Sequence, residues 1–251
     1  MMESSTYDKK VSGKFSDNLA RNIKEGKFIH MAKFGVDFSY AYIKARYLSL
    51  LNRRFKFQGK EYKYLYYYST WRDERCVEVP IVWNLLNNSK ALERRLDILE
   101  IGNVLSYYYK FSHDVVDKYE VGDGVINEDI VTFNPNKRYD LIISVSTIEH
   151  VGWDEAPRVE GKLTKALENI KALLKPEGFA VITMPVGYNK EFDALYSSGR
   201  IAFDKAYYLK RVKRSDWVES DWNETKDSRF DYPYKFANAL IIGIIGNYDW
   251  I

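Results

Sequence analysis

The sequence predicts an α/β fold in which a mostly parallel sheet is covered by helices on both faces. From residue 96 onward, short apolar segments that suit strands alternate with segments of helical periodicity. The segment "YDLIISVSTI" is almost continuously apolar, which is typical of a strand buried on both faces. Upstream, residues 28–51 place apolar side chains at helical spacing with Lys and Arg between them, which indicates an amphipathic helix.

The remaining elements follow from local patterns in chain order. "FKFQGKEYKYLYYY" alternates around Gly59 and predicts a hairpin, and "VEVPIVWNLLNN" predicts a short helix. After the fourth strand we expect a helix capped by Asp154 with Pro157 in its first turn, closed by a "KPEG" turn. "EFDALYSSG" predicts another short helix. The strands of the sheet are expected at 97–101, 114–117, 139–148, 179–185, 206–212 and 237–246, and residues 125–133 should form a brief third strand and a loop.

Charge divides the chain into two parts. Residues 1–90 carry 17 Lys+Arg and 9 Asp+Glu, a net +8, whereas residues 91–251 carry 21 and 26, a net −5. We interpret residues 1–90 as a helical, aromatic cap that is not an independent domain, and residues 91–251 as the core. The basic segment is either a solvated surface or a region that meets an anionic partner.

Cysteine content and hydropathy exclude several classes of protein. A single cysteine, Cys76, gives no internal disulfide framework and argues against a zinc site. The first 25 residues do not resemble a signal peptide, and the longest apolar run, "ALIIGII", is too short to span a bilayer. We therefore expect no membrane insertion and a cytoplasmic location, and we leave the oligomeric state open.

Polar residues follow the first four strands of the predicted sheet, where ligands of such folds bind. Asp117 comes 15 residues after Gly102, and a carboxylate at such a strand end can accept both hydroxyls of a ribose. The candidate cofactor-binding residues are Glu100, Gly102, Asn103, Asp117, Lys118, Asp129, Ile130, Val145 and Ser146.

Three stretches of this region carry a family resemblance: "LDILEIGN", "YDLIISVSTIEHVG" and "ALLKPEGFAVITMPVG". Together they resemble the class I S-adenosylmethionine-dependent methyltransferases. The resemblance implies a Rossmann-like, doubly wound, mostly parallel seven-stranded sheet with an antiparallel C-terminal hairpin, and S-adenosylmethionine as cofactor. It also implies Glu100 and Gly102 beside the methionine portion, Asp117 on the ribose, and Asp129 and Ile130 flanking the adenine.

The first motif departs from the family pattern, because Val104 and Ser106 stand where two further glycines are usual. A dinucleotide needs glycine there so that backbone N–H groups can approach its phosphates. S-adenosylmethionine has no phosphate, so the loss weighs more against a nicotinamide cofactor than against a methyl donor. A degenerate fold that has lost its cofactor remains an alternative.

His150 follows the fourth strand and is the candidate catalytic residue, acting as general base or as an acceptor-positioning group. A purely structural histidine is the competing interpretation. Glu149 and His150 are also similar to part of the Glu-x-x-Glu-His pattern of metal-dependent RNA-end methyltransferases. Ser146 replaces the first Glu of that pattern, so we expect no metal.

The sequence thus predicts an enzyme that transfers a methyl group from S-adenosylmethionine to an oxygen of a small molecule or glycan, with nitrogen as the second choice. The alternatives are a nucleic-acid-binding or RNA-modifying protein on the same fold, which the basic segment with its interleaved aromatics suggests, and a non-catalytic member of the family. Nucleic acid is not the favoured partner.

Overall fold

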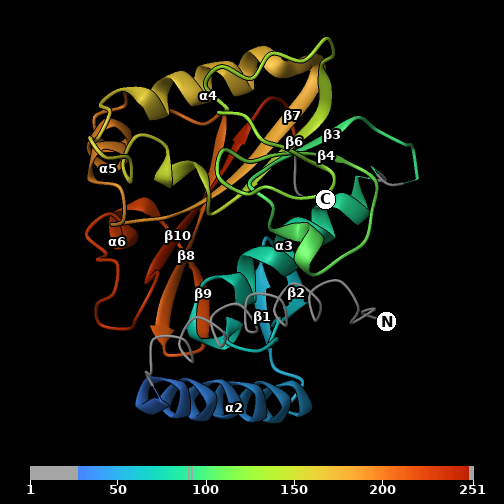
Figure 1. The fold of residues 1–251 in the computed structure, drawn as a ribbon. Helices are drawn as coiled ribbons and strands as arrows, with labels where there is room; N and C mark the ends of the chain where they lie inside the picture. Colours follow the sequence, from blue (N-terminus) through green and yellow to red (C-terminus); the bar gives the residue numbers. More distant parts are fainter. Residues whose placement is uncertain (1–27, 90, 92, 249–251) are drawn as a thin grey trace.

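The computed structural model describes residues 28–89, 91 and 93–248 and contains an eight-stranded sheet (Figure 1). The strand order is β5-β4-β3-β6-β7-β10-β8-β9. Neighbouring strands are parallel from β5 through β7, whereas β10 is antiparallel to both β7 and β8, and β9 is antiparallel to β8. This confirms the predicted Rossmann-like α/β class, with a mostly parallel sheet and antiparallel strands at the C-terminal end of the chain.

Seven strands of the large sheet overlap their predicted positions, and β9 was not predicted. Their bounds are β3 Ile98–Ile101, β4 Asp114–Val116, β5 Val125–Ile126, β6 Tyr139–Val145, β7 Leu174–Pro185, β8 Lys205–Lys213, β9 Asp216–Ser220 and β10 Ala239–Ile245.

Helices cover both faces of the sheet, as predicted. Helix α3 (Arg75–Asn88) shares one hydrophobic cluster with Leu141, Ile143 and Val145 of β6. Helix α4 (Lys162–Leu173) and helix α5 (Lys190–Ser197) belong to a second cluster that contains Ile142. Alternate residues of β6 therefore face opposite layers, which explains why its sequence is apolar throughout.

The N-terminal part adds a long helix and a small hairpin beside the sheet. Helix α2 (Phe28–Leu50) lies at the end of the molecule opposite α4, and the β1 (Arg54–Phe57) and β2 (Lys60–Lys63) hairpin lies between α2 and the sheet (Figure 1). Both the predicted helix and the predicted hairpin are present. The dependence of residues 1–90 on the core stays a prediction, and residues 1–27 lie outside the described part.

Short helical segments complete the fold. They are the 3₁₀ helices η1 (Thr70–Arg72), η2 (Leu105–Tyr107) and η3 (Ile148–His150), and α6 (Trp222–Thr225). No helix within the described ranges is long and apolar enough to cross a membrane.

Three local expectations are wrong. The sheet has eight strands rather than seven, because the polar edge segment "DWVES" buries only Trp217 and so gives little apolar signal, yet it pairs with β8. Strand β7 starts at Leu174, so "KPEG" belongs to the strand rather than to a turn. Helix α4 starts at Lys162 behind Gly161, and Asp154 does not cap it because its carboxylate binds side chains instead.

Candidate functional site

A cavity of about 600 Å³ lies at the carboxyl ends of β3, β4 and β6. We call it the acidic cavity, because its charged lining consists of five carboxylates and one lysine. These residues are Asp117, Glu120, Glu128, Asp129, Glu155 and Lys118. Of the residues selected from sequence, Gly102, Asp117, Lys118, Asp129, Ile130 and His150 line this cavity. Glu100, Asn103, Val145 and Ser146 are buried outside its lining.

The turn after β3 is held together by Glu100, whose side chain is fully buried. Its Oε1 accepts hydrogen bonds from the backbone N–H groups of Val104 at 2.8 Å and Leu105 at 2.6 Å. Its Oε2 lies 2.7 Å from Nε2 of His113. The amides that would hold a phosphate in a dinucleotide fold are therefore occupied by a carboxylate of the chain itself.

Gly102 is required by two features of its position. Its φ is +79°, in the left-handed region that favours glycine, and a Cβ added there would lie 2.3 Å from the hydroxyl oxygen of Thr147. The ends of β3 and β6 therefore approach each other closely at the cavity wall.

The other buried candidates support this wall from behind. The side-chain amide of Asn103 donates to Glu120 at 2.6 Å, and Glu120 lines the cavity. The carbonyl of Val145 accepts from Arg75 at 2.7 Å. The hydroxyl of Ser146 donates to Glu78 at 2.7 Å.

Asp117 is half-buried and turns the chain at the end of β4. Its Oδ1 accepts from the backbone N–H groups of Tyr119 at 2.8 Å and Glu120 at 2.7 Å. Within the described residues no hydrogen bond to Oδ2 is present. One carboxylate oxygen thus fixes the turn and the other is available to a ligand.

Asp129 belongs to a network of two lysines and two carboxylates. Its Oδ2 lies 3.1 Å from the ammonium of Lys118 and 2.6 Å from that of Lys162, and both lysines also reach Glu155. Burial favours a higher pKa for Asp129, but the hydrogen bonds from Lys162 and Lys118 hold its pKa below the usual value. Beside it, Ile130 presents a nearly buried apolar side chain.

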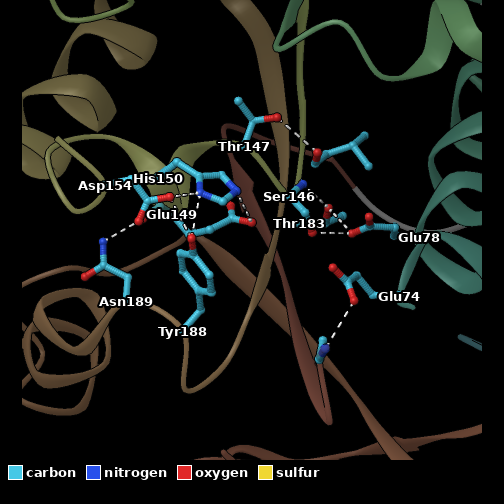
Figure 2. A network of polar contacts seen from close by, with 12 residues as sticks. Glu74, Glu78, Ser146, Thr147, Glu149, His150, Asp154, Thr183, Tyr188 and Asn189 are labelled. Carbon is cyan, nitrogen blue, oxygen red and sulfur yellow. Dashed lines mark hydrogen bonds and ion pairs between the residues drawn. The ribbon is translucent and has the colours of Figure 1, made fainter. Parts of the chain in front are cut away.

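His150 is 45% exposed and is oriented by a carboxylate (Figure 2). Its Nδ1 lies 2.5 Å from Oδ2 of Asp154, and the hydroxyl of Tyr188 donates to the same oxygen at 2.6 Å. Burial would raise the pKa of Asp154, but hydrogen bonds from Tyr188 and His150 keep its pKa below the usual value. With the proton on Nδ1 facing Asp154, the Nε2 lone pair can accept a proton.

Behind His150 lie buried carboxylates that the sequence did not reveal as a group (Figure 2). Glu78 of α3 is fully buried and accepts from Ser146 at 2.7 Å and from Thr183 at 2.8 Å. Glu149 is 2% exposed, its Oε1 lies 3.7 Å from Nε2 of His150, and its Oε2 has no hydrogen-bond partner within the described residues. Burial raises the pKa of Glu149 well above its usual range.

Sequence reasoning missed several contributors to the site, among them Tyr188, Lys162 and Glu155. Tyr188 follows β7 directly, so the rule that strand ends carry ligand-binding residues could have found it. Lys162 and Glu155 gave no signal, because they come from the segment that was expected to be helical. No group of three or more His, Cys, Asp and Glu side chains within the described ranges could hold a metal ion.

Comparison with known proteins finds likeness only at the level of structure. No protein-family model matches the chain, and no curated protein matches it. One similar solved structure is the N-methyltransferase NodS from Bradyrhizobium japonicum WM9 in complex with S-adenosyl-L-homocysteine, at 12% identity and a TM-score of 0.40, covering 70% of this chain and 92% of that one.

Two further solved structures have a similar likeness. The sugar N-methyltransferase KedS8 from Streptoalloteichus sp. has 9% identity and a TM-score of 0.36, with 69% of this chain and 89% of that one covered. An S-adenosylmethionine-dependent methyltransferase from Clostridium acetobutylicum has 12% identity and a TM-score of 0.33, with 66% and 91% covered. The fold class of the present chain is assigned from its own strand order and pairing.

Proposed function

We propose that this chain is an S-adenosylmethionine-dependent methyltransferase that acts on a hydroxyl group of a small molecule or glycan. One observation carries the proposal: a glycine at a tight strand end, a carboxylate with an available oxygen and a carboxylate-oriented histidine surround the same cavity. These are Gly102, Asp117 and His150.

The size and charge of the acidic cavity support this cofactor. A volume of about 600 Å³ lies within the usual range for a small-molecule or cofactor site. The charged lining is mostly carboxylate, which attracts the sulfonium and ammonium groups of S-adenosylmethionine and repels the pyrophosphate of a dinucleotide. Glu100 already accepts hydrogen bonds from the turn amides, and this also argues against a bound phosphate.

Each part of the cofactor has a suitable partner. Oδ2 of Asp117 would accept hydrogen bonds from the ribose hydroxyls. Ile130 offers an apolar surface for the adenine, and the backbone at Gly102 lets the methionine portion pass close to the chain. Asp129 would accept from the adenine amino group through a second hydrogen bond to Oδ1, which already accepts from the backbone N–H of Val131, because the lysines occupy its Oδ2.

His150 would act as the general base. S-adenosylmethionine supplies an electrophilic methyl carbon bonded to a sulfonium. In that transfer Nε2 of His150 would take the hydroxyl proton of the acceptor, and the sulfur would leave with the electron pair of the bond to the methyl carbon. Asp154 stabilises the resulting imidazolium through Nδ1. Alignment of acceptor and methyl supplies most of the remaining acceleration.

The histidine–aspartate pair favours oxygen over nitrogen as the acceptor atom. A hydroxyl is a weak nucleophile until a base removes its proton, whereas a neutral amine can attack first and lose its proton afterwards. A base oriented by both Asp154 and Tyr188 therefore suits a hydroxyl better.

Calorimetry tests the cofactor assignment. The wild-type protein should bind S-adenosylmethionine and S-adenosylhomocysteine but not NAD. Asp117→Ala removes the acceptor of the two proposed hydrogen bonds from the ribose hydroxyls. These bonds are worth about 2–4 kcal/mol, so the affinity for S-adenosylmethionine should fall at least about tenfold. Asp123→Ala, an exposed carboxylate in the same loop outside the cavity lining, is the matched control and should bind normally. Unchanged affinity in Asp117→Ala would remove the ribose assignment, and tighter binding of NAD would overturn the cofactor.

A further inference from the structure

A second cavity, of about 350 Å³, has the opposite charge. We call it the basic cavity, because its charged lining consists of four cationic residues and one acid. These residues are Arg72, Arg211, Arg214, Lys235 and Asp37. Asp37 and Arg72 come from the N-terminal part, and the other three come from the C-terminal third of the chain. No residue lines both cavities.

Arg211 builds the basic cavity. It is 5% exposed, and within the described part of the chain its guanidinium donates to backbone carbonyls alone, namely those of Arg72, Arg214, Lys235 and Ala237. Three of these four carbonyls belong to residues that carry a cationic side chain into the lining. A single buried cation therefore fixes the backbone of three other cations around one space.

The charge of this cluster is only partly compensated. Asp37 receives two hydrogen bonds from Arg72, at 2.8 and 2.9 Å. Arg214 and Lys235 are exposed and make no ion pair within the described residues, and Arg211 makes none either. Partly buried Asp73 and buried Glu74 act on Arg211 through space, and burial keeps the pKa of Arg211 below its usual value. The lining holds an excess of three positive charges.

Aromatic rings form the other walls. Tyr40 is 50% exposed and stands edge-on to Trp71, with ring centroids 6.2 Å apart. Tyr234 and Phe236 come from a loop that Asn238 closes by donating to the carbonyls of both residues. An exposed ring beside uncompensated cations suits a ligand that has a flat group and an anionic group.

We propose that the basic cavity binds a mononucleotide, with the phosphate on Arg214 and Lys235 and the base on the Tyr40 side. A phosphate needs cationic donors close together, and the carbonyl contacts of Arg211 fix the backbone that carries them. A nucleobase needs an accessible ring face or edge, which Tyr40 offers. This site is independent of the methyltransferase proposal, because it shares no lining residue with the acidic cavity.

Equilibrium binding of AMP, ribose 5-phosphate and inorganic phosphate to the full chain tests the proposal. Of the three ligands, AMP should bind most tightly. Its affinity should fall as the salt concentration increases. The double variant Arg214→Gln/Lys235→Gln should lose at least about tenfold in affinity for AMP and for ribose 5-phosphate. Lys213→Gln, an exposed neighbour outside the cavity, is the charge control and should bind normally.

A second pair of variants tests the ring, and a third variant tests the location. Tyr40→Leu should weaken AMP about threefold or more and leave ribose 5-phosphate unchanged, whereas Tyr47→Leu, 60% exposed on the same helix, should change neither. Asp117→Ala in the acidic cavity should leave AMP binding intact. The proposal is overturned if AMP does not bind, if Asp117→Ala abolishes binding while the double variant does not, or if a single-stranded oligonucleotide binds much more tightly than AMP.

Discussion

Each of the two cavities has a buried charged side chain that hydrogen-bonds to backbone groups, and the two side chains have opposite charges. In the acidic cavity, buried Glu100 gathers two backbone amides of the turn after β3. In the basic cavity, buried Arg211 gathers the carbonyls of four residues. Each charge is stabilised by oriented backbone dipoles, and among the described residues His113 is the one side chain that bonds to either. A buried charge can therefore shape a site through the backbone groups that it holds in place.

The difference between them lies in sequence distance. Glu100 bonds to residues four and five positions away, so the whole turn is one local unit. Arg211 joins segments as far apart as Arg72 and Ala237. The acidic cavity should therefore tolerate changes elsewhere in the fold, and the basic cavity should depend on how the N-terminal part packs against the sheet.

The largest expected effect concerns turnover in the acidic cavity. His150→Ala should lower methyl transfer about 10²–10⁴-fold, because the acceptor proton loses its base. Affinity for S-adenosylmethionine and the melting temperature should stay close to wild type, since the ring is 45% exposed. Transfer of labelled methyl to a panel of hydroxyl and amine compounds, with calorimetry in parallel, measures both quantities.

Two further results decide how to interpret that experiment. AMP binding at the basic cavity should be unaffected in His150→Ala, which keeps the two cavities separate. A lower melting temperature with nearly normal turnover per folded molecule would make His150 structural, and the general-base assignment would then be wrong.

The next effect is on stability. Arg211→Met removes the donor shared by partly buried or buried carbonyls of three segments, so the free energy of unfolding should fall by about 3–5 kcal/mol. Urea denaturation monitored by tryptophan fluorescence measures it. Lys210→Met, the partly exposed neighbour on β8, is the control and should cost far less. Equal losses in the two variants would show that Arg211 does not hold the basic cavity together.

The two cavities also differ in how far they could be predicted from the sequence. The acidic cavity was predictable because Gly102, Asp117 and His150 each follow a strand of a parallel sheet, and such strand ends meet at one edge. The contacts of Glu100 were not, since no pattern tells whether a strand-end carboxylate faces a ligand or its own turn. The basic cavity was not predictable either, because long-range packing brings Arg72 to Lys235.

A smaller loss is expected from Glu100→Gln. The amide can still accept from the two turn N–H groups, but it loses the negative charge that strengthens those bonds and the contact with His113. The free energy of unfolding should fall by about 1–3 kcal/mol. The exposed Glu177→Gln is the control. A loss as large as that of Arg211→Met would contradict the local character of this turn.

The smallest expected effect is an increase in stability, caused by a substitution of Glu149. Burial raises the pKa of Glu149 above its ordinary value of 4.5, and its Oε2 has no partner within the described residues. Above that ordinary value the unfolded chain releases the proton while the folded protein still holds it. Stability therefore falls as pH rises from 4.5 toward the folded pKa, and the full cost is present only above that pKa.

Glu149→Gln should remove this penalty, because a neutral amide of the same shape never ionises. The variant should melt at about the wild-type temperature near pH 4.5 and a few degrees higher at pH 8, as expected for about 1–2 kcal/mol in a chain of this size. Thermal denaturation of both proteins across this range measures it, with exposed Glu177→Gln showing no pH-dependent difference. If Glu149→Gln instead lowers the melting temperature at pH 8, the carboxylate is held ionised in the folded protein. The surroundings of Glu149 would then resemble the turn around Glu100, where hydrogen bonds satisfy a buried charge.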